Sequence, residues 1–209
     1  MAGLTRPLKW LFALTLATIV AACAPAIDTT KPPEDLGNFR LGHNIVVARN
    51  PQLGPLSRRV TEAQWQEALT SAIADRFGRY DGSKLYHLGI SVDGYVLAPP
   101  GIPIVASPKS VLIFTVTAWD DAKGVKLNEK AMQLTVLENL SEDTFVGSSL
   151  TQTAEQQMTN LSFTAARAVQ KWLLGNPEWF ADEPGATTPP ALSAPADATS
   201  LPASAIATN

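Results

Sequence analysis

Residues 61–97 read TEAQWQEALTSAIADRFGRYDGSKLYHLGISVDGYVL and decide the fold, because a helix pattern is followed directly by a strand pattern. Thr61 and Gln64 fit a capping box, in which the Thr hydroxyl and the Gln side chain each satisfy a free amide at the helix start. Apolar residues at every fourth position predict one buried helix face: Trp65, Leu69, Ile73 and Phe77. Gly78 is expected to end the helix as a left-handed cap.

Strand patterns lie on both sides of this helix. Residues 39–48 predict a first strand, and residues 85–97 predict a second one with Leu88, Ile90, Val92 and Val96 on a single face. Residues 110–119 are rich in β-branched and aromatic types, and residues 129–138 alternate between apolar and polar. Asp120 and Asp121 are expected to open a hairpin turn between these last two segments. Three consecutive strands with short connections indicate an antiparallel meander.

A second helix is expected to start near residues 151–153, because Thr153 to Gln156 repeats the capping-box pattern. Gly175, Asn176 and Pro177 are expected to end it. The order β-α-β-β-β-α predicts an α+β fold, a two-layer sandwich of two helices on a roughly four-stranded, mainly antiparallel sheet. The other face of that sheet remains for solvent or a partner. Three tryptophans are expected in the core or at the seam between the layers: Trp65, Trp119 and Trp172.

Composition argues against several classes of function. Charged residues are 17% of the 209 residues, the formal net charge is −3, and no basic run appears. A nucleic-acid binder normally concentrates Lys and Arg to neutralise phosphates. The single cysteine cannot form an internal disulfide or a cysteine-based zinc site, and His43 and His87 have no metal-ligand spacing. We therefore expect no metal, no cofactor and no nucleic-acid partner.

The first 22 residues have the features of a secretory signal peptide. Arg6 and Lys9 form a positively charged start, residues 10–20 are almost entirely apolar, and Ala21 and Ala22 follow. The apolar part is about a dozen residues long, whereas a membrane-spanning helix needs roughly 20. A retained membrane span is therefore not expected.

The end of this segment, Val20-Ala21-Ala22-Cys23, resembles the lipobox of bacterial lipoproteins. The resemblance covers residues 1–23 only. It implies that a diacylglyceryl group is attached to the Cys23 thiol, that the signal is cut between Ala22 and Cys23, and that the new amino group is acylated by a fatty acid such as palmitate. A plain secretory signal that happens to end in a Cys is the alternative interpretation.

Lipidation would fix the compartment of the mature chain. Each buried methylene contributes about 0.8 kcal/mol, and two or more acyl chains anchor stably. In lipoproteins, Asp after the Cys often retains the protein at the inner membrane; Ala24 stands there, which implies the periplasmic face of the outer membrane. Loss of Arg6 and Lys9 leaves 14 basic and 19 acidic side chains, a formal charge of −5.

Four regions are predicted along the chain. Residues 1–22 form the signal peptide, and residues 23–35 form a lipidated, proline-containing tether. Residues 36–180 form the α+β domain. Residues 181–209, rich in Pro, Ala, Ser and Thr, are expected to be disordered, because they cannot bury enough apolar surface.

Two apolar segments are candidates for partner contact, since exposed apolar patches tend to mark contact sites. The first is residues 98–105, with Ile102, Ile104 and Val105; the second is Trp179 with Phe180. Each segment has the alternative of folding back over a sheet edge.

No catalytic residue is expected. An enzyme would need His87 within hydrogen-bonding reach of a carboxylate or hydroxyl in a cleft.

The predicted architecture is similar to that of small envelope accessory lipoproteins, including the auxiliary lipoproteins of ABC-type transport systems and the small lipoprotein of the lipopolysaccharide-assembly translocon. This resemblance lies in architecture and not in a residue motif. It implies a non-enzymatic accessory or assembly factor that contacts another envelope protein. The alternative is a small-ligand or lipid-binding module, which would need an apolar cavity between the helices and the sheet.

Overall fold

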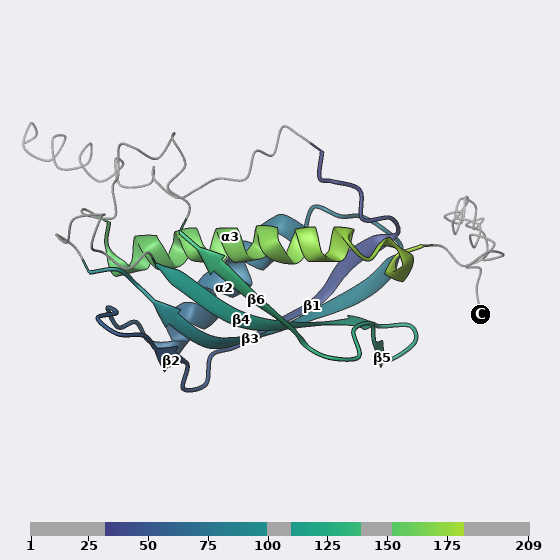
Figure 1. Ribbon diagram of the computed structural model, residues 1–209. Coiled ribbons are helices and arrows are strands. Elements are labelled where there is room, and N and C mark those ends of the chain that lie inside the picture. Colours follow the sequence, from purple (N-terminus) through teal and green to yellow (C-terminus); the bar gives the residue numbers. More distant parts are fainter. Residues whose placement is uncertain (1–31, 100–109, 139–151, 182–209) are drawn as a thin grey trace, which may run out of the picture.

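The computed structural model describes residues 32–99, 110–138 and 152–181 (Figure 1). The elements within these ranges follow the predicted order, with the two-residue strands β2 and β5 added. They are β1 (Phe39–Val47), β2 (Gln52–Leu53), α2 (Glu62–Phe77), β3 (Lys84–Val96), β4 (Val111–Asp120), β5 (Val125–Lys126), β6 (Met132–Leu137), α3 (Ala154–Leu174) and the short 3-10 helix η3 (Pro177–Trp179).

The sheet is mixed. β4 lies antiparallel to β3 on one side and to β5 and β6 on the other, which confirms the predicted meander. β1 and β2 instead pair with β3 in parallel. The parallel pairing follows from α2, because a strand–helix–strand crossover brings the second strand back in the same direction as the first.

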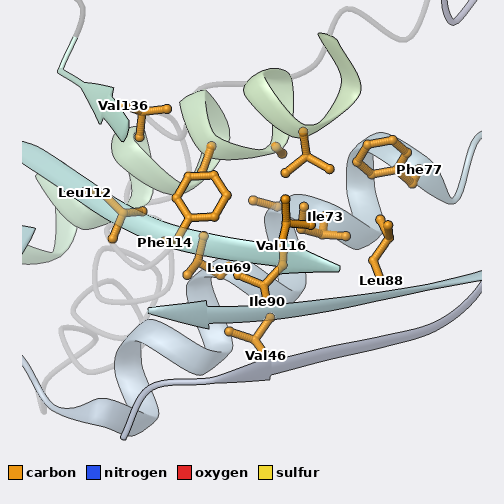
Figure 2. Close-up of a cluster of buried hydrophobic side chains, with 14 of the residues drawn as sticks. Val46, Leu69, Ile73, Phe77, Leu88, Ile90, Leu112, Phe114, Val116 and Val136 are labelled. Carbon is orange, nitrogen blue, oxygen red and sulfur yellow. The ribbon is translucent and has the colours of Figure 1, made fainter. Parts of the chain in front are cut away.

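Both helices pack on one face of this open sheet, so the predicted two-layer α+β sandwich is confirmed (Figure 1). Figure 2 shows Leu69 and Ile73 of α2 against Ile90 of β3 and Phe114 of β4. The main apolar residues on the inner faces of α2 and α3 have an exposed fraction of 0%: Trp65, Leu69, Ile73, Phe77, Leu161, Ala165, Val169 and Leu173. The layer between the helices and the sheet is therefore closed to solvent along these side chains.

The helix ends agree with the sequence except at Gly78. Thr61 and Thr153 each form the complete predicted capping box, and Gly175 follows the last residue of α3. Gly78, predicted to be left-handed, has a right-handed φ of −66°. Its amide still donates to the Ala74 carbonyl oxygen, so the helical geometry continues through the cap and the chain leaves without a reversal of hand.

A bulge in β3 changes which side chains point into the core. The register with β4 shifts between Val92 and Gly94, which leaves Asp93 as the extra residue. Beyond the bulge, Tyr95 is buried and Val96 is only half-buried on the opposite face. The prediction that Val96 shares a face with Val92 was wrong, because one inserted residue reverses the alternation of a strand.

The described chain enters and leaves at the same end of the sandwich, which we call the tether end (Figure 1). The Asn38 amide donates to the Phe180 carbonyl oxygen at 3.2 Å, and the Tyr80 hydroxyl donates to the Glu34 carbonyl oxygen at 2.8 Å. The Lys84 ammonium group donates to the Ala181 carbonyl oxygen at 3.2 Å. Residues 32–38 and 177–181 are thus bound side by side.

The opposite end of the sandwich, which we call the distal end, holds the end of β3, the start of β4 and the end of β6. Ser110 connects them, because its hydroxyl accepts from the Ala98 amide and its carbonyl oxygen accepts from the Glu138 amide. Arg58 links this end to the start of α3 through the Gln152 carbonyl oxygen, 3.0 Å away.

Gly82, in the turn between α2 and β3, provides a test of the packing at the tether end. A Cβ atom there would lie 2.5–2.7 Å from three backbone atoms of Phe39. We expect Gly82→Ala to lower the free energy of unfolding by about 1–3 kcal/mol or more, because the backbone at Phe39 must move to make room for the Cβ atom. Urea denaturation followed by circular dichroism measures this. Gly89→Ala is the matched control, since its Cβ would meet only the Thr117 carbonyl oxygen at 3.9 Å. Equal midpoints for the two variants would contradict the packing.

Candidate functional site

The face of the sheet that the helices leave uncovered, here called the outer face, carries several exposed apolar side chains. Ile45 of β1 is 60% exposed, Leu137 of β6 is 48% exposed and Trp119 of β4 is 37% exposed. The prediction that Trp119 fills the core was wrong. The buried positions of β4 alternate from Leu112 to Ala118, so Trp119 falls on the outer face, where the Lys126 ammonium group lies 5.4 Å from the ring centre.

A hollow of about 490 Å³ lies on this outer face, toward the distal end. We call it the outer-face pocket. Its volume is within the range of roughly 300–1,000 Å³ that is usual for ligand sites. Its lining combines apolar residues of four strand or loop segments with a few polar groups: Gln52, Leu53, Gly54, Pro55, Asp93, Gly94, Tyr95, Val96, Val111, Ile113 and Gln133.

The bulge and a glycine create the pocket. Gly94 pairs with Ile113 of β4 on one side and with Gln52 of β2 on the other. A Cβ atom at Gly94 would lie 3.0 Å from the Gln52 carbonyl oxygen. The glycine therefore allows β2 to approach closely, and it leaves the pocket floor without a side chain.

Asp93 is the charged group of the outer-face pocket. Its Oδ2 atom accepts a hydrogen bond from the Thr115 hydroxyl at 2.6 Å and another from the Gln133 amide nitrogen at 3.1 Å. The three residues form a row across β3, β4 and β6. The bulge aims the carboxylate at this row, as bulges beside functional sites often do.

His87 joins three elements near the tether end of the outer face. Its Nδ1 atom accepts from the His43 amide at 2.8 Å, and its Nε2 atom lies 2.7 Å from Asp121 Oδ1. Nδ1 must therefore be the unprotonated nitrogen and Nε2 the donor. Gly42 provides the space for the ring, because a Cβ atom there would lie 2.5 Å from Nδ1.

This arrangement meets only half of the requirement for an enzyme. A carboxylate is within reach of His87, but His87 lines neither the outer-face pocket nor the smaller hollow beside Phe180. Both ring nitrogens already form hydrogen bonds, so His87 has no free lone pair with which to remove a substrate proton. Within residues 32–99, 110–138 and 152–181, no cluster of His, Cys, Asp and Glu side chains could hold a metal ion.

The predicted contact residues near the C-terminus lie at the tether end. Phe180 is 1% exposed and packs edge-on against Phe39 and Tyr86, with ring centres 5.5 and 5.0 Å away. Trp179 is half-buried and lies edge-on to Trp172. Of the two interpretations of this segment, the structure supports folding back onto the domain. The Phe180 ring has almost no free surface in this arrangement, and contact of Trp179 and Phe180 with a partner stays a prediction.

The remaining predicted site residues lie outside the described ranges. These are Ala22 and Cys23 of the lipobox and the apolar residues Ile102, Ile104 and Val105. The outer-face pocket was not predicted from the sequence. Its signal was present in the dipeptide Asp93-Gly94 within an apolar strand, since an isolated glycine in a strand indicates a bulge or a close backbone approach.

No protein-family model matches the chain, and no curated protein matches it either. Similar solved structures include a DUF330-family protein from Xanthomonas campestris, with 10% identity, a TM-score of 0.41 and coverage of 74% of this chain and 95% of that one. A minor lipoprotein from Acinetobacter baumannii shares 18% identity, with a TM-score of 0.29 and coverage of 69% and 95%. The PelC dodecamer from Paraburkholderia phytofirmans shares 10% identity, with a TM-score of 0.30 and coverage of 68% and 92%.

These likenesses are distant, and no residue role passes from them to this chain.

The described helices α2 and α3 lack the combination of length and apolar composition that a membrane span requires.

Proposed function

We propose that this protein is a lipid-anchored accessory protein of the bacterial cell envelope, held by an acylated Cys23, that acts through contact with another envelope protein. The observation that carries the proposal is the sequence Val20-Ala21-Ala22-Cys23 at the end of a short apolar segment. The proposed address is the periplasmic face of the outer membrane.

The arrangement of the domain fits this anchor. Residues 24–31 connect Cys23 to the described chain and, at up to about 3.5 Å per residue, reach at most roughly 30 Å. They join the domain at the tether end. With the tether end nearest the bilayer, the outer-face pocket and the distal end point away from it, where a partner can reach them.

The hydrogen bonds of His87 and the exposed apolar side chains of the outer face favour contact over catalysis. The one histidine beside a carboxylate in the described ranges, His87, uses both ring nitrogens to join strands. The outer face, in contrast, combines exposed apolar side chains with a pocket. A small-ligand module is the second candidate function; the outer-face pocket favours it, in place of the cavity between helices and sheet that this alternative was expected to need.

Site-specific photocrosslinking in intact cells tests the contact. A photoreactive residue at Leu137, on the outer face, is expected to give one discrete adduct. The same residue at Ala74, on the exposed side of α2, is expected to give none, because that surface lies on the opposite side of the sandwich. Replacing Ile102 and Ile104 with Ser tests the sequence-based contact segment, and is expected to weaken the Leu137 adduct. Failure to obtain an adduct from Leu137 in membrane-attached protein contradicts the contact function.

A further inference from the structure

We infer that the outer-face pocket binds a cationic group carried on an apolar stem, namely a Lys or Arg side chain in an extended segment of the partner protein. This inference rests on the proposed function, because it names the chemistry that the partner offers. Three features of the pocket support it: the state of its carboxylate, the nature of its walls and the charge of the chain.

The carboxylate of Asp93 is held in place by hydrogen bonds but has no positively charged partner within the described ranges. Both of its hydrogen-bond donors, Thr115 and Gln133, are neutral and use the same oxygen, Oδ2. Within the described part of the chain, no hydrogen bond reaches Oδ1 and no ion pair involves Asp93. A carboxylate held in this way has no cationic partner and leaves one oxygen available for an incoming cation. Hydrogen bonds between ions are shorter and stronger than neutral ones.

The walls beside Asp93 fit the hydrocarbon part of a long basic side chain. Val96, Val111 and Ile113 line the pocket from β3 and β4, and Leu53 lines it from β2. Lys and Arg characteristically lay their methylene stems along apolar surface while the charged group finds a polar partner. A neutral apolar ligand would leave Asp93 facing hydrocarbon, whereas a small hydrated cation would leave the apolar walls unused.

The size and charge of the surroundings also favour a basic segment of protein. The pocket volume of about 490 Å³ exceeds that of a single side chain, so it accommodates the residues beside the cation as well. The mature chain has a formal charge of −5, and a net negative charge attracts basic partners during encounter.

Titration with small probes tests the chemistry directly. The full mature chain with Cys23→Ser, labelled with ¹⁵N, is titrated with methylguanidinium, butylguanidinium, butylammonium and butanol. We expect the two butyl cations to shift the amide signals of Gly94, Ile113 and Gln133. Affinity should rise from methylguanidinium to butylguanidinium as the stem lengthens. This series in the unaltered pocket needs no variant that might fail to fold.

Asp93→Asn isolates the charge, because Asn keeps an oxygen that accepts from Thr115 and Gln133. We expect it to weaken butylguanidinium binding by about tenfold and to leave the weak binding of butanol unchanged. Asp121→Asn is the matched control on the same face. Its carboxylate is already occupied by His87, so this variant should bind the probes as the parent does.

Three results would each overturn the inference: equal affinity for butanol and butylguanidinium, unchanged cation binding in Asp93→Asn, or shifts confined to amides outside the pocket. None of these results would affect the anchor or the Leu137 adduct. Conversely, cation binding without any adduct from Leu137 would remove the partner and support a small-molecule site with the same chemistry. The failures of the two proposals are therefore distinguishable.

Discussion

Replacing Cys23 with Ser is expected to leave the precursor unlipidated and uncut after Ala22, because in the lipoproteins that residues 1–23 resemble the signal is cut only after the lipid is attached. The chain has one cysteine, so the variant has no thiol to which the diacylglyceryl group can be attached. Stable anchoring requires two or more acyl chains, each methylene of which contributes about 0.8 kcal/mol. Intact-mass measurement of the chain recovered from the envelope detects both the loss of the acyl mass and the retention of residues 1–22.

Ala26→Ser is the matched control, because it adds a hydroxyl to the tether outside the lipobox. It should stay acylated and membrane-bound. If the parent protein is cut, carries no acyl mass and is recovered in the soluble fraction, the alternative of a plain secretory signal is correct. The proposed anchor and its membrane address would then both be lost.

Phe39→Ala is expected to cost about 3–5 kcal/mol of the free energy of unfolding, as truncation of buried aromatic residues generally does. Phe39 is 1% exposed. Its ring stacks on Tyr86 at 5.4 Å and lies edge-on to Tyr80 and Phe180 at 5.5 Å each. Because a whole domain is stable by only about 5–15 kcal/mol, this single change removes a large fraction of the free energy of unfolding.

Urea denaturation of the Cys23→Ser mature chain, followed by circular dichroism, measures the loss. Ile45→Ala is the control in the same strand. Ile45 is 60% exposed, so its truncation should change stability by less than about 0.5 kcal/mol. Similar midpoints for the two variants would show that the aromatic cluster does not hold the tether end together.

A second group of side chains stabilises the tether end. Gln170 of α3 accepts a hydrogen bond from Arg76 at 2.7 Å and donates to the Tyr80 hydroxyl at 2.8 Å. Burial raises the pKa of Tyr80 above its ordinary value, because the phenolate would lose its hydration. The neutral hydroxyl donates to the Glu34 backbone carbonyl oxygen, so α2, α3 and the end of the tether are connected through one partly buried chain of hydrogen bonds.

Local patterns predicted the elements well. The capping boxes at Thr61 and Thr153 formed as predicted, because their hydrogen bonds join residues three positions apart. The apolar face of α2 is buried at every predicted position. These features depend on neighbours within one turn of chain, which the sequence displays directly.

The candidate site followed from the sequence only in part. Cys23 was found from a contiguous motif, and it stays a prediction. The outer-face pocket was missed, since Asp93, Thr115 and Gln133 come from three strands and meet only through the registers between them. The contact of His87 with Asp121 was missed for the same reason, because His87 lies within β3 and Asp121 follows the end of β4.

By itself, the sequence determined the two helices, the principal strands and the two-layer arrangement, because periodicity and capping are properties of short segments. Only the tertiary structure decided that β1 runs parallel to β3, that Trp119 faces outward and that Phe180 is buried. One inserted residue at Asp93 decided which side chains of β3 beyond it face the core. The physical reason is that strand pairing joins residues distant in the chain, and a shift of one position exchanges the two faces of a strand.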